Sequence, residues 1–400
     1  MRDRSVSSKG LAGLLFAVAC LLAGGLIFAF ACMAAGCTSA PDTGSRAGGG
    51  GDAGGSGGGS AGGGGSAGGT AGGNGGGGGS NVPGDMAVDP VNTDGGGVGT
   101  TSAVTIIVEP SDNTAALVAA VNAAKTSIHM TMYLLTNKAI MTALIAKEKA
   151  GLDVKVILNT TFPSGTDASA TNASSYTTLT TASPAVPTKW SSSAFVYTHE
   201  KCIIIDNTTA WIMTMNATQS SAQTNREYLA IDTDPTDVAE AESIFESDYA
   251  MTTSTASAPL IVSPTNSQSK LVTLIQGATS TIDLEVEELS DTQMVSALTA
   301  AADAKVTVKI ALPNNTLTSA QQSALTTLKA HKIPVVELAN PYLHAKAIVI
   351  DSARAYIGSE NFTDNSLNMN RELGLIIGAP SEVAKVLTTV RADFAAGTAL

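Results

Sequence analysis

The chain has 400 residues, with 22 basic and 34 acidic side chains and a formal net charge of −12 at pH 7. This balance argues against a protein that wraps nucleic acid, because non-specific binding to a polyanion depends on clustered Lys and Arg. Charged residues make up 14% and aromatic residues 4% of the chain, which excludes a coiled coil and a charged disordered tail. Of its 40 glycines, 28 lie between Gly44 and Gly99, so the chain divides into an apolar head, a glycine-rich tether and 300 residues of ordinary globular composition.

The head, residues 1–37, has the composition of an export signal. Three positive residues near the N-terminus precede the apolar stretch 10–30, and small residues lead to Cys37. The last four residues resemble a bacterial lipobox, so we expect Cys37 to be lipidated and to anchor an extracytoplasmic lipoprotein to a membrane. An uncleaved anchor over 11–35 and simple secretion remain alternatives, since about 20 apolar residues suffice to span a bilayer. All three place residues 38–400 outside the cytosol, with 38–100 as a flexible linker.

The globular part contains an internal repeat of strands and helices. Apolar strands alternate with helical patterns, which predicts an α/β fold with largely covered sheets. The expected elements are strands at 104–108, 127–134 and 154–158 with helices at 113–124 and 138–150 in the first copy, and strands at 260–262, 281–286 and 306–311 with helices at 269–277 and 292–302 in the second. We therefore expect two lobes, 101–255 and 256–400.

The two copies align at an offset of 154 residues and then, after nine extra residues in the first copy, at an offset of 145. The extra residues fall in 160–193, a segment rich in Thr, Ser and Ala that we expect to be a loop beside the site. Seven polar identities share the second offset: His199, Lys201, Asp206, Asn216, Asn225, Arg226 and Glu227 match His344, Lys346, Asp351, Asn361, Asn370, Arg371 and Glu372. Composition alone does not produce such a register.

Alternate residues of a strand share one face, so each copy directs an imidazole, an ammonium, a hydroxyl and an amide together. These are His199, Lys201, Thr214 and Asn216 in the first copy, and His344, Lys346, Ser359 and Asn361 in the second. Such a set suits a phosphodiester, because cations and neutral donors hold its oxygens while one imidazole attacks phosphorus and the other protonates the leaving alkoxide. Glu227 and Glu372 are candidates to hold an imidazole by its second nitrogen. The residues alone allow either histidine to be the nucleophile.

Two further pairs of residues flank the repeated histidines. Tyr197 and Tyr342 stand two residues before them, on the same strand face, and are the expected aromatic contacts to substrate. Asp206 and Asp351 have the opposite parity and precede turn-like residues, so we expect a structural role for them. Cys202 lies in an apolar run and is expected to be buried as a small hydrophobic side chain.

These residues resemble the signature of the phospholipase D superfamily, which is His-x-Lys, then Asp after four residues, then Gly-Ser-x-Asn after six more. The second copy matches it fully, whereas the first has Met213 at the glycine and Thr214 at the serine. The resemblance implies two similar lobes of mixed sheets flanked by helices, related by a pseudo-twofold axis with one active site between them. It also implies a covalent phosphohistidine intermediate, with His199 as nucleophile and His344 as general acid, and no metal or other cofactor.

We therefore expect an exported, monomeric phosphodiesterase that hydrolyses or transphosphatidylates phospholipids at a membrane. A metal-independent endonuclease of the same superfamily and a catalytically decayed phosphate-binding protein are the alternatives. The acidic charge and the membrane-directed head favour the lipid. Nucleic acid is thus the less favoured partner, and the head group and the acceptor alcohol are left open.

Overall fold

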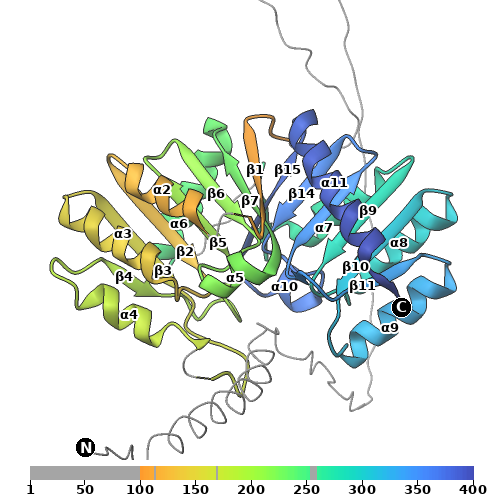
Figure 1. Ribbon diagram of the computed structural model, residues 1–400, viewed down its shortest axis with the longest axis horizontal. Helices are drawn as coiled ribbons and strands as arrows, with labels where there is room; N and C mark the ends of the chain where they lie inside the picture. Colours follow the sequence, from red (N-terminus) through yellow and green to blue (C-terminus); the bar gives the residue numbers. More distant parts are fainter. Residues whose placement is uncertain (1–99, 112–113, 168–169, 253–258) are drawn as a thin grey trace, which may run out of the picture. The chain divides into compact units, whose positions relative to one another are not determined.

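The computed structural model describes residues 100–111, 114–167, 170–252 and 259–400 (Figure 1). The expected head with Cys37 and the expected linker up to residue 99 lie outside these ranges, as does the expected junction of the lobes at 255 and 256. Within the described ranges, no helix combines the length and the apolar composition needed to cross a bilayer.

The first lobe is a mixed sheet with helices. Its strands are β1 (Val104–Glu109), β2 (Ser127–Met132), β3 (Asp153–Leu158), β4 (Thr188–Trp190), β5 (Lys201–Ile205), β6 (Thr209–Met213) and β7 (Asn225–Asp232). Its helices are α2 (Ala115–Ala123), α3 (Lys138–Lys149), α4 (Ala173–Thr180), α5 (Gln219–Thr224) and α6 (Pro235–Tyr249). The strand order is β1-β7-β6-β5-β2-β3-β4, in which β2, β3 and β4 are parallel and the other pairings are antiparallel.

The second lobe repeats this plan. Its strands are β8 (Ile261–Ser263), β9 (Thr281–Val286), β10 (Thr307–Pro313), β11 (Val335–Leu338), β12 (Tyr342–Leu343), β13 (Lys346–Ile350), β14 (Arg354–Gly358), β15 (Glu372–Ile377) and β16 (Thr398–Ala399). Its helices are α7 (Ser267–Gln276), α8 (Thr292–Asp303), α9 (Ser319–Ala330), α10 (Asp364–Asn368) and α11 (Pro380–Ala396). The order is β16-β11-β10-β9-β13-β14-β15-β8, with β9, β10 and β11 parallel, while β12 pairs with β7 of the first lobe.

Among the described residues, three large apolar cores hold these layers together. Helices α2, α3 and α4 pack on the outer face of the first sheet, and α7, α8 and α9 pack on the outer face of the second. The inner faces of both sheets contribute to a single core that also contains α6 and α11. Because the lobes share this core, side chains at the adjacent ends of both sheets can reach one another.

Local sequence signals explain where several helices begin. Asn137, Asp234 and Asp291 accept hydrogen bonds from the first free N–H groups of α3, α6 and α8, and a proline opens α6. Helix α9 begins with a reciprocal capping box between Thr318 and Gln321. These caps satisfy donors that would otherwise be left unpaired at the helix ends.

The predicted fold class, two similar lobes of mixed sheets flanked by helices, is confirmed. The loop expected over 160–193 is wrong, because this segment contains α4 and β4. Helix α4 is held by a buried amide rather than by an apolar stripe: the Asn172 side chain accepts from Leu135 N at 2.9 Å and donates to Tyr133 O at 2.7 Å. Only Ser175 and Leu179 of the helix are buried, so its sequence carries little hydrophobic periodicity. The predicted burial of Cys202 is confirmed, at 2% exposed.

Candidate active site

The site consists of two histidine–glutamate pairs that cross between the lobes. His199 Nδ1 lies 2.9 Å from Oε2 of Glu372, and His344 Nδ1 lies 2.8 Å from Oε1 of Glu227. Both carboxylates are fully buried. The structure thus places each glutamate beside an imidazole nitrogen of the other repeat's histidine, and the role of the two glutamates in holding the imidazoles stays a prediction.

Backbone pairing between the lobes produces this exchange. The segment before His199 runs parallel to the segment before Glu372, with His199 N donating to Arg371 O at 2.9 Å and Arg371 N donating to Tyr197 O at 2.9 Å. In the equivalent place of the other lobe, β12 runs parallel to the start of β7. Each histidine is therefore placed beside the start of the strand that carries the partner carboxylate, Glu372 in β15 and Glu227 in β7.

The residues around each carboxylate hold it in position. Glu372 accepts from Ser366 Oγ at 2.6 Å and from Asn370 Nδ2 at 3.0 Å. Glu227 accepts from Thr214 Oγ1 at 2.5 Å and from Asn225 Nδ2 at 3.2 Å. The repeated Asn-x-Glu pattern is thus explained by an amide that donates to the carboxylate two residues later.

The environment of His199 favours its neutral form. Burial lowers the pKa of this imidazole most, and the charges of Lys201 and Lys346 lower it further, so that it lies at about 4 despite the opposing charge of Glu372. Burial alone would raise the pKa of Glu372, but the charge and hydrogen bond of His199 bring it below its usual value. With Nδ1 directed at Glu372, the lone pair of a neutral His199 is on Nε2, the atom that a nucleophile needs.

The two lysines are buried and tied to their own motifs. Lys346 Nζ donates to His344 O at 2.7 Å, and Lys201 Nζ donates to His199 O at 2.5 Å. Each ammonium thus contacts the backbone of the histidine of its own motif, and the common face expected for the two side chains stays a prediction. Asn216 and Asn361 are also buried, at 2% and 1% exposed, and Asn361 Nδ2 lies 3.5 Å from Glu287 Oε2.

The hydroxyls of Thr214 and Ser359 are turned toward the neighbouring strand. They accept from Tyr228 N at 2.9 Å and Leu373 N at 3.1 Å, respectively. The structure makes Thr214 a donor to Glu227, a contact that the sequence analysis missed. A substrate contact by either hydroxyl stays a prediction.

The tyrosines before the histidines have different surroundings. Tyr197 belongs to a small apolar cluster with Tyr133, Leu134 and the half-buried Phe162. Tyr342 instead donates from its hydroxyl to Glu287 Oε1 at 3.2 Å, and burial raises its pKa well above the ordinary value. Their contact with substrate stays a prediction, but the two half-sites clearly differ in polarity.

Sequence reasoning missed two residues next to the histidines. The ring of Tyr133 meets the His199 ring edge-on, with centroids 4.5 Å apart, and lies 5.0 Å from Lys201 Nζ. Glu287 places Oε2 2.9 Å from Lys346 Nζ and 3.5 Å from His344 Nε2. Tyr133 and Glu287 occupy equivalent positions of the two repeats at the offset of 154. They can be found in the sequence by looking for positions at which the two copies differ, and not only for identical residues.

Other repeated residues are structural. Asp206 accepts from the N–H groups of Lys125, Thr126 and Ser127. Burial would raise its pKa, but these hydrogen bonds lower it below the usual value. Asp351 does the same for residues 279–281 in the second lobe. Both aspartates have positive φ angles in the turns they close, as expected for a turn role.

The repeated arginines pair across the lobes like the histidines. Arg371 is fully buried and contacts Asp248 of α6, with Nε 2.8 Å from Oδ2. Arg226 contacts Asp393 of α11, with Nε 2.5 Å from Oδ2. These pairs connect the last helix of each lobe to the other lobe, so the arginines stabilise the interface between the lobes.

One cluster with metal-ligating side chains lies apart from the site in the described part of the chain, formed by His129, Glu242 and Glu246. His129 Nδ1 lies 2.6 Å from Glu242 Oε1, and the ring stacks on Phe245. The ammonium of Lys155 lies 2.7 Å from Glu246, so a cation is already present in the cluster. These contacts attach α6 to β2 and β3.

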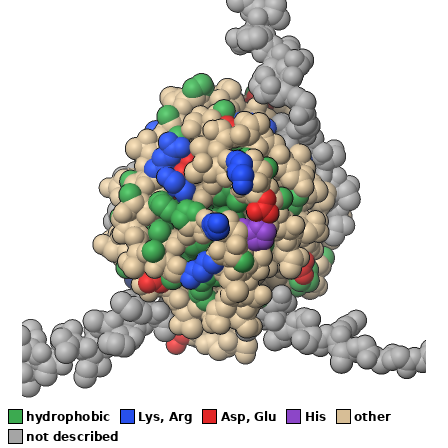
Figure 2. All heavy atoms as spheres, turned by 90° about the vertical axis from the view of Figure 1, so that its right-hand side faces the viewer, with side chains coloured by type: hydrophobic (Ala, Val, Ile, Leu, Met, Phe, Trp, Pro, Cys, Tyr) green, Lys and Arg blue, Asp and Glu red, His purple; other side chains and the backbone are tan. Residues whose placement is uncertain are grey.

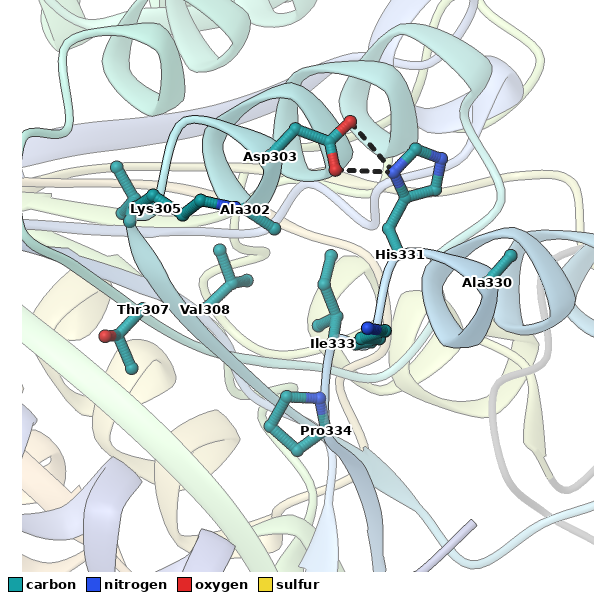
Figure 3. Close-up of a pocket in the computed structure, with 11 residues that line it drawn as sticks. Ala302, Asp303, Lys305, Thr307, Val308, Ala330, His331, Ile333 and Pro334 are labelled. Carbon is teal, nitrogen blue, oxygen red and sulfur yellow. Dashed lines mark hydrogen bonds and ion pairs between the residues drawn. The ribbon is translucent and has the colours of Figure 1, made fainter.

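The outer end of the second lobe has no feature of the site. Figure 2 shows this face, where Lys and Arg side chains stand in several separate groups, next to acidic side chains and hydrophobic surface. A pocket of about 410 Å³ lies here, between the C-terminal ends of α8 and α9 (Figure 3). His331 lines it and bonds Asp303 at 3.0 Å. The pocket includes Thr307, at the start of β10, whereas Glu287 follows the end of β9. Because β9 and β10 are parallel, the pocket lies at the edge of the sheet opposite to Glu287 and the histidines.

Solved structures with a similar fold belong to several enzymes. Phosphatidylserine synthase of Haemophilus influenzae aligns over 76% of this chain and 89% of its own, with 13% identity and a TM-score of 0.58. Polyphosphate kinase of Porphyromonas gingivalis aligns over 72% of this chain and 46% of its own, with 16% identity and a TM-score of 0.57. Nuc, a phospholipase D family member of Salmonella typhimurium, aligns over 35% of this chain and 95% of its own, with 21% identity and a TM-score of 0.34.

A sequence comparison with curated proteins gives no match. A scan against protein families matches residues 117–249 and 271–395 to the family described as cardiolipin synthase, PLD-like domain. Each matched range falls within one lobe. Each contains one histidine and one glutamate of the crossed pairs, together with one of the two buried lysines. The chain therefore belongs to the phospholipase D superfamily, with both PLD-like repeats in one polypeptide.

Proposed function

We propose that the protein is a phospholipase D-type phosphodiesterase that transfers the phosphatidyl group of a phospholipid to water or to an alcohol. The single observation that carries this proposal is the pair of crossed His–Glu contacts, which place two oriented imidazoles at one junction. A phosphodiester needs a nucleophile and an acid on opposite sides of phosphorus, and two such imidazoles supply both.

The chemistry proceeds in two displacements. Nε2 of His199 attacks phosphorus, the P–N bond forms as the P–O bond to the head group breaks, and Nε2 of His344 gives its proton to the leaving oxygen. Water or an alcohol then loses a proton to His344 and attacks phosphorus, and the P–N electron pair returns to His199. The ammonium groups of Lys201 and Lys346 offset the negative charge on the phosphoryl oxygens.

Three observations support a lipid as the substrate. The apolar cluster around Tyr133 and Tyr197 lies on the His199 side, where the phosphatidyl part would be held during the covalent stage. The chain is acidic, with a formal net charge of −12, which disfavours a polyanion as the substrate. The apolar head and glycine-rich tether would keep the enzyme near a membrane, in the extracytoplasmic location we propose for it.

The activity is tested with the full chain in detergent, incubated with phosphatidylcholine and ethanol, and separately with plasmid DNA, with EDTA present throughout. We expect phosphatidylethanol from the wild type and none from His199→Ala or His344→Ala. His331→Ala is the matched control, since this histidine lies at the outer end of the second lobe, and it should retain full activity. Nicked DNA without a lipid product would instead indicate the nuclease, and inactivity on both and on bis(4-nitrophenyl) phosphate would indicate a binding protein.

Membrane attachment is a separate proposal with its own test. We expect the full chain, expressed in a bacterium, to sediment with the membranes, and Cys37→Ala to release it if the attachment is a lipid on that residue. Retention of the variant in the membrane fraction would indicate an uncleaved anchor over residues 11–35.

A further inference from the structure

The pseudo-twofold relation between the lobes is broken directly beside the two histidines. Tyr133 follows β2, and Glu287 follows β9 in the equivalent place. The backbone is the same at both positions, because Tyr133 N donates to Glu200 O at 3.0 Å and Glu287 N donates to Ala345 O at 3.1 Å. One half-site therefore carries a neutral aromatic ring where the other carries a carboxylate.

The ring of Tyr133 occupies the position beside His199 at which the other half-site has a carboxylate. It packs edge-on against the imidazole and is itself 2% exposed. Burial then dominates the titration of His199 and lowers its pKa to about 4. A neutral imidazole with its Nδ1 on Glu372 is a nucleophile, not an acid.

The carboxylate of Glu287 creates the opposite environment for His344. Its Oε2 atom lies 3.5 Å from His344 Nε2 and 2.9 Å from Lys346 Nζ, and its side chain is 2% exposed. Although burial raises the pKa of Glu287, the charges of His344 and Lys346 hold it at about 2. Glu287 is therefore ionised at every pH at which the enzyme would act.

His344 thus lies between two carboxylates, one at each ring nitrogen. The titratable and charged groups around it are Glu227 from β7, Glu287 after β9, Lys346 from β13, Tyr342 from β12 and His199 before β5. Neither ring nitrogen has an acceptor in good hydrogen-bond geometry within the described residues. A proton on Nε2 would therefore face the carboxylate of Glu287 without being committed to it by a hydrogen bond, and it could pass to a leaving oxygen.

We propose that Glu287 is a positioning residue: its carboxylate lies 3.5 Å from Nε2 of His344, where the first half-site has the ring of Tyr133 beside His199, and this difference makes His344 the general acid and His199 the nucleophile. The inference rests on the proposed function, because it assigns the two roles within that reaction. The asymmetry decides the order of events: the histidine beside Tyr133 attacks first, and the one beside Glu287 supplies the proton.

The test compares two esters that share the phosphatidyl part and differ in the leaving group. Choline leaves from phosphatidylcholine as an alkoxide that needs a proton, whereas 4-nitrophenol leaves from phosphatidyl-4-nitrophenol without one. We expect Glu287→Gln to lose roughly 100-fold in kcat/KM on phosphatidylcholine, the usual size of a general-acid contribution, and about threefold or less on the nitrophenyl ester. The basic limb of the kcat/KM profile on phosphatidylcholine should move down by about one pH unit or more, because a nearby charge is removed.

Two controls separate this role from a structural one. Glu287→Asp keeps the carboxylate, so its kcat/KM on phosphatidylcholine should be at least tenfold higher than that of Glu287→Gln. Glu288→Gln makes the same chemical change one position later. It should leave the ratio of kcat/KM on phosphatidylcholine to kcat/KM on the nitrophenyl ester unchanged. Thermal melting of each variant checks that it is folded.

Each outcome decides between the two proposals. Equal losses on both esters, or an unmoved basic limb, would overturn the role of Glu287 while leaving the phosphodiesterase in place. A wild-type enzyme that cleaves neither ester would overturn the proposed function and the role of Glu287 with it. A wild-type enzyme that cleaves both, with a variant defective only on phosphatidylcholine, establishes the role of Glu287.

Discussion

His199 Nδ1 lies 2.9 Å from Oε2 of Glu372, a residue 173 positions later in the chain and in the other lobe. The reverse contact joins His344 to Glu227 at 2.8 Å. His199 is therefore held in its working tautomer by a carboxylate that its own repeat does not supply, and His344 has a carboxylate of the other repeat beside Nδ1.

Glu372→Gln should reduce kcat by about 100-fold to 10,000-fold, because an amide can present an N–H to Nδ1 and so place the imidazole proton on Nε2, where the lone pair is needed. Steady-state hydrolysis of phosphatidylcholine measures the loss. Asn370→Ala removes only a donor to the carboxylate and should cost far less. Equal effects of the two substitutions would contradict a tautomer role for Glu372.

The acid limb of the kcat/KM profile should have its midpoint near pH 4 rather than near 6.5. This follows from the pKa of about 4 for His199, which is lowered mainly by burial, since the imidazole loses its lone pair only when the pH falls through that value. A pH series on the nitrophenyl ester measures this limb, because no proton is needed by its leaving group. A midpoint at the ordinary histidine value would show that His199 is not the nucleophile.

Stability should decrease as the pH rises from about 4.5 to about 8. Burial raises the pKa of Glu200 and of Glu360 to about 8, so both are protonated in the folded protein over a range in which the unfolded chain is ionised. Their contribution to stability is complete below the unfolded pKa and is lost as the pH approaches 8. Urea unfolding at pH 5, 7 and 9 measures this dependence.

Glu360→Gln provides the matched comparison for that titration. The glutamine keeps the shape of the side chain that accepts from Tyr356 at 2.5 Å and Ser267 at 3.0 Å, but it cannot ionise. We expect the free energy of unfolding of this variant to depend less steeply on pH between 5 and 9. A slope identical to that of the wild type would show that Glu360 does not titrate in this range.

Asp248→Asn should destabilise the protein by about 3–5 kcal/mol, because it leaves the buried guanidinium of Arg371 without its partner. Glu382→Gln is the comparison, because its partner Lys385 is 42% exposed, the ion pair contributes about 0–1 kcal/mol, and a glutamine oxygen can still accept from Ile106 N. Urea unfolding at one pH measures both. Similar small effects would indicate that Arg371 finds another partner between the lobes.

Much of the fold was accessible from the sequence because the two copies repeat the same period of apolar residues. The strand over 281–286 is found as predicted, and most other predicted elements end within a few residues of the observed ones. Helix α4 was missed since its position is set by the buried side chain of Asn172, and a single polar residue leaves no periodic pattern.

The candidate site was only partly accessible for a related reason. A repeat aligns Glu227 with Glu372 but does not reveal that each contacts the opposite histidine, because the exchange is made by backbone pairing between the lobes. Tyr133 and Glu287 were not predicted, because a comparison limited to identical residues leaves out positions at which the two copies differ. Their chemistry depends on that difference.

The crossed contacts of His199 with Glu372 and His344 with Glu227 have the form found at the interface of a symmetric dimer, where residue i of one subunit meets residue j of the other and the reverse. The contacts of Arg226 with Asp393 and Arg371 with Asp248 repeat that form. The two lobes thus relate to each other as subunits fused into one chain. Fusion frees each half to diverge at a position such as Tyr133 or Glu287, which two identical subunits cannot do.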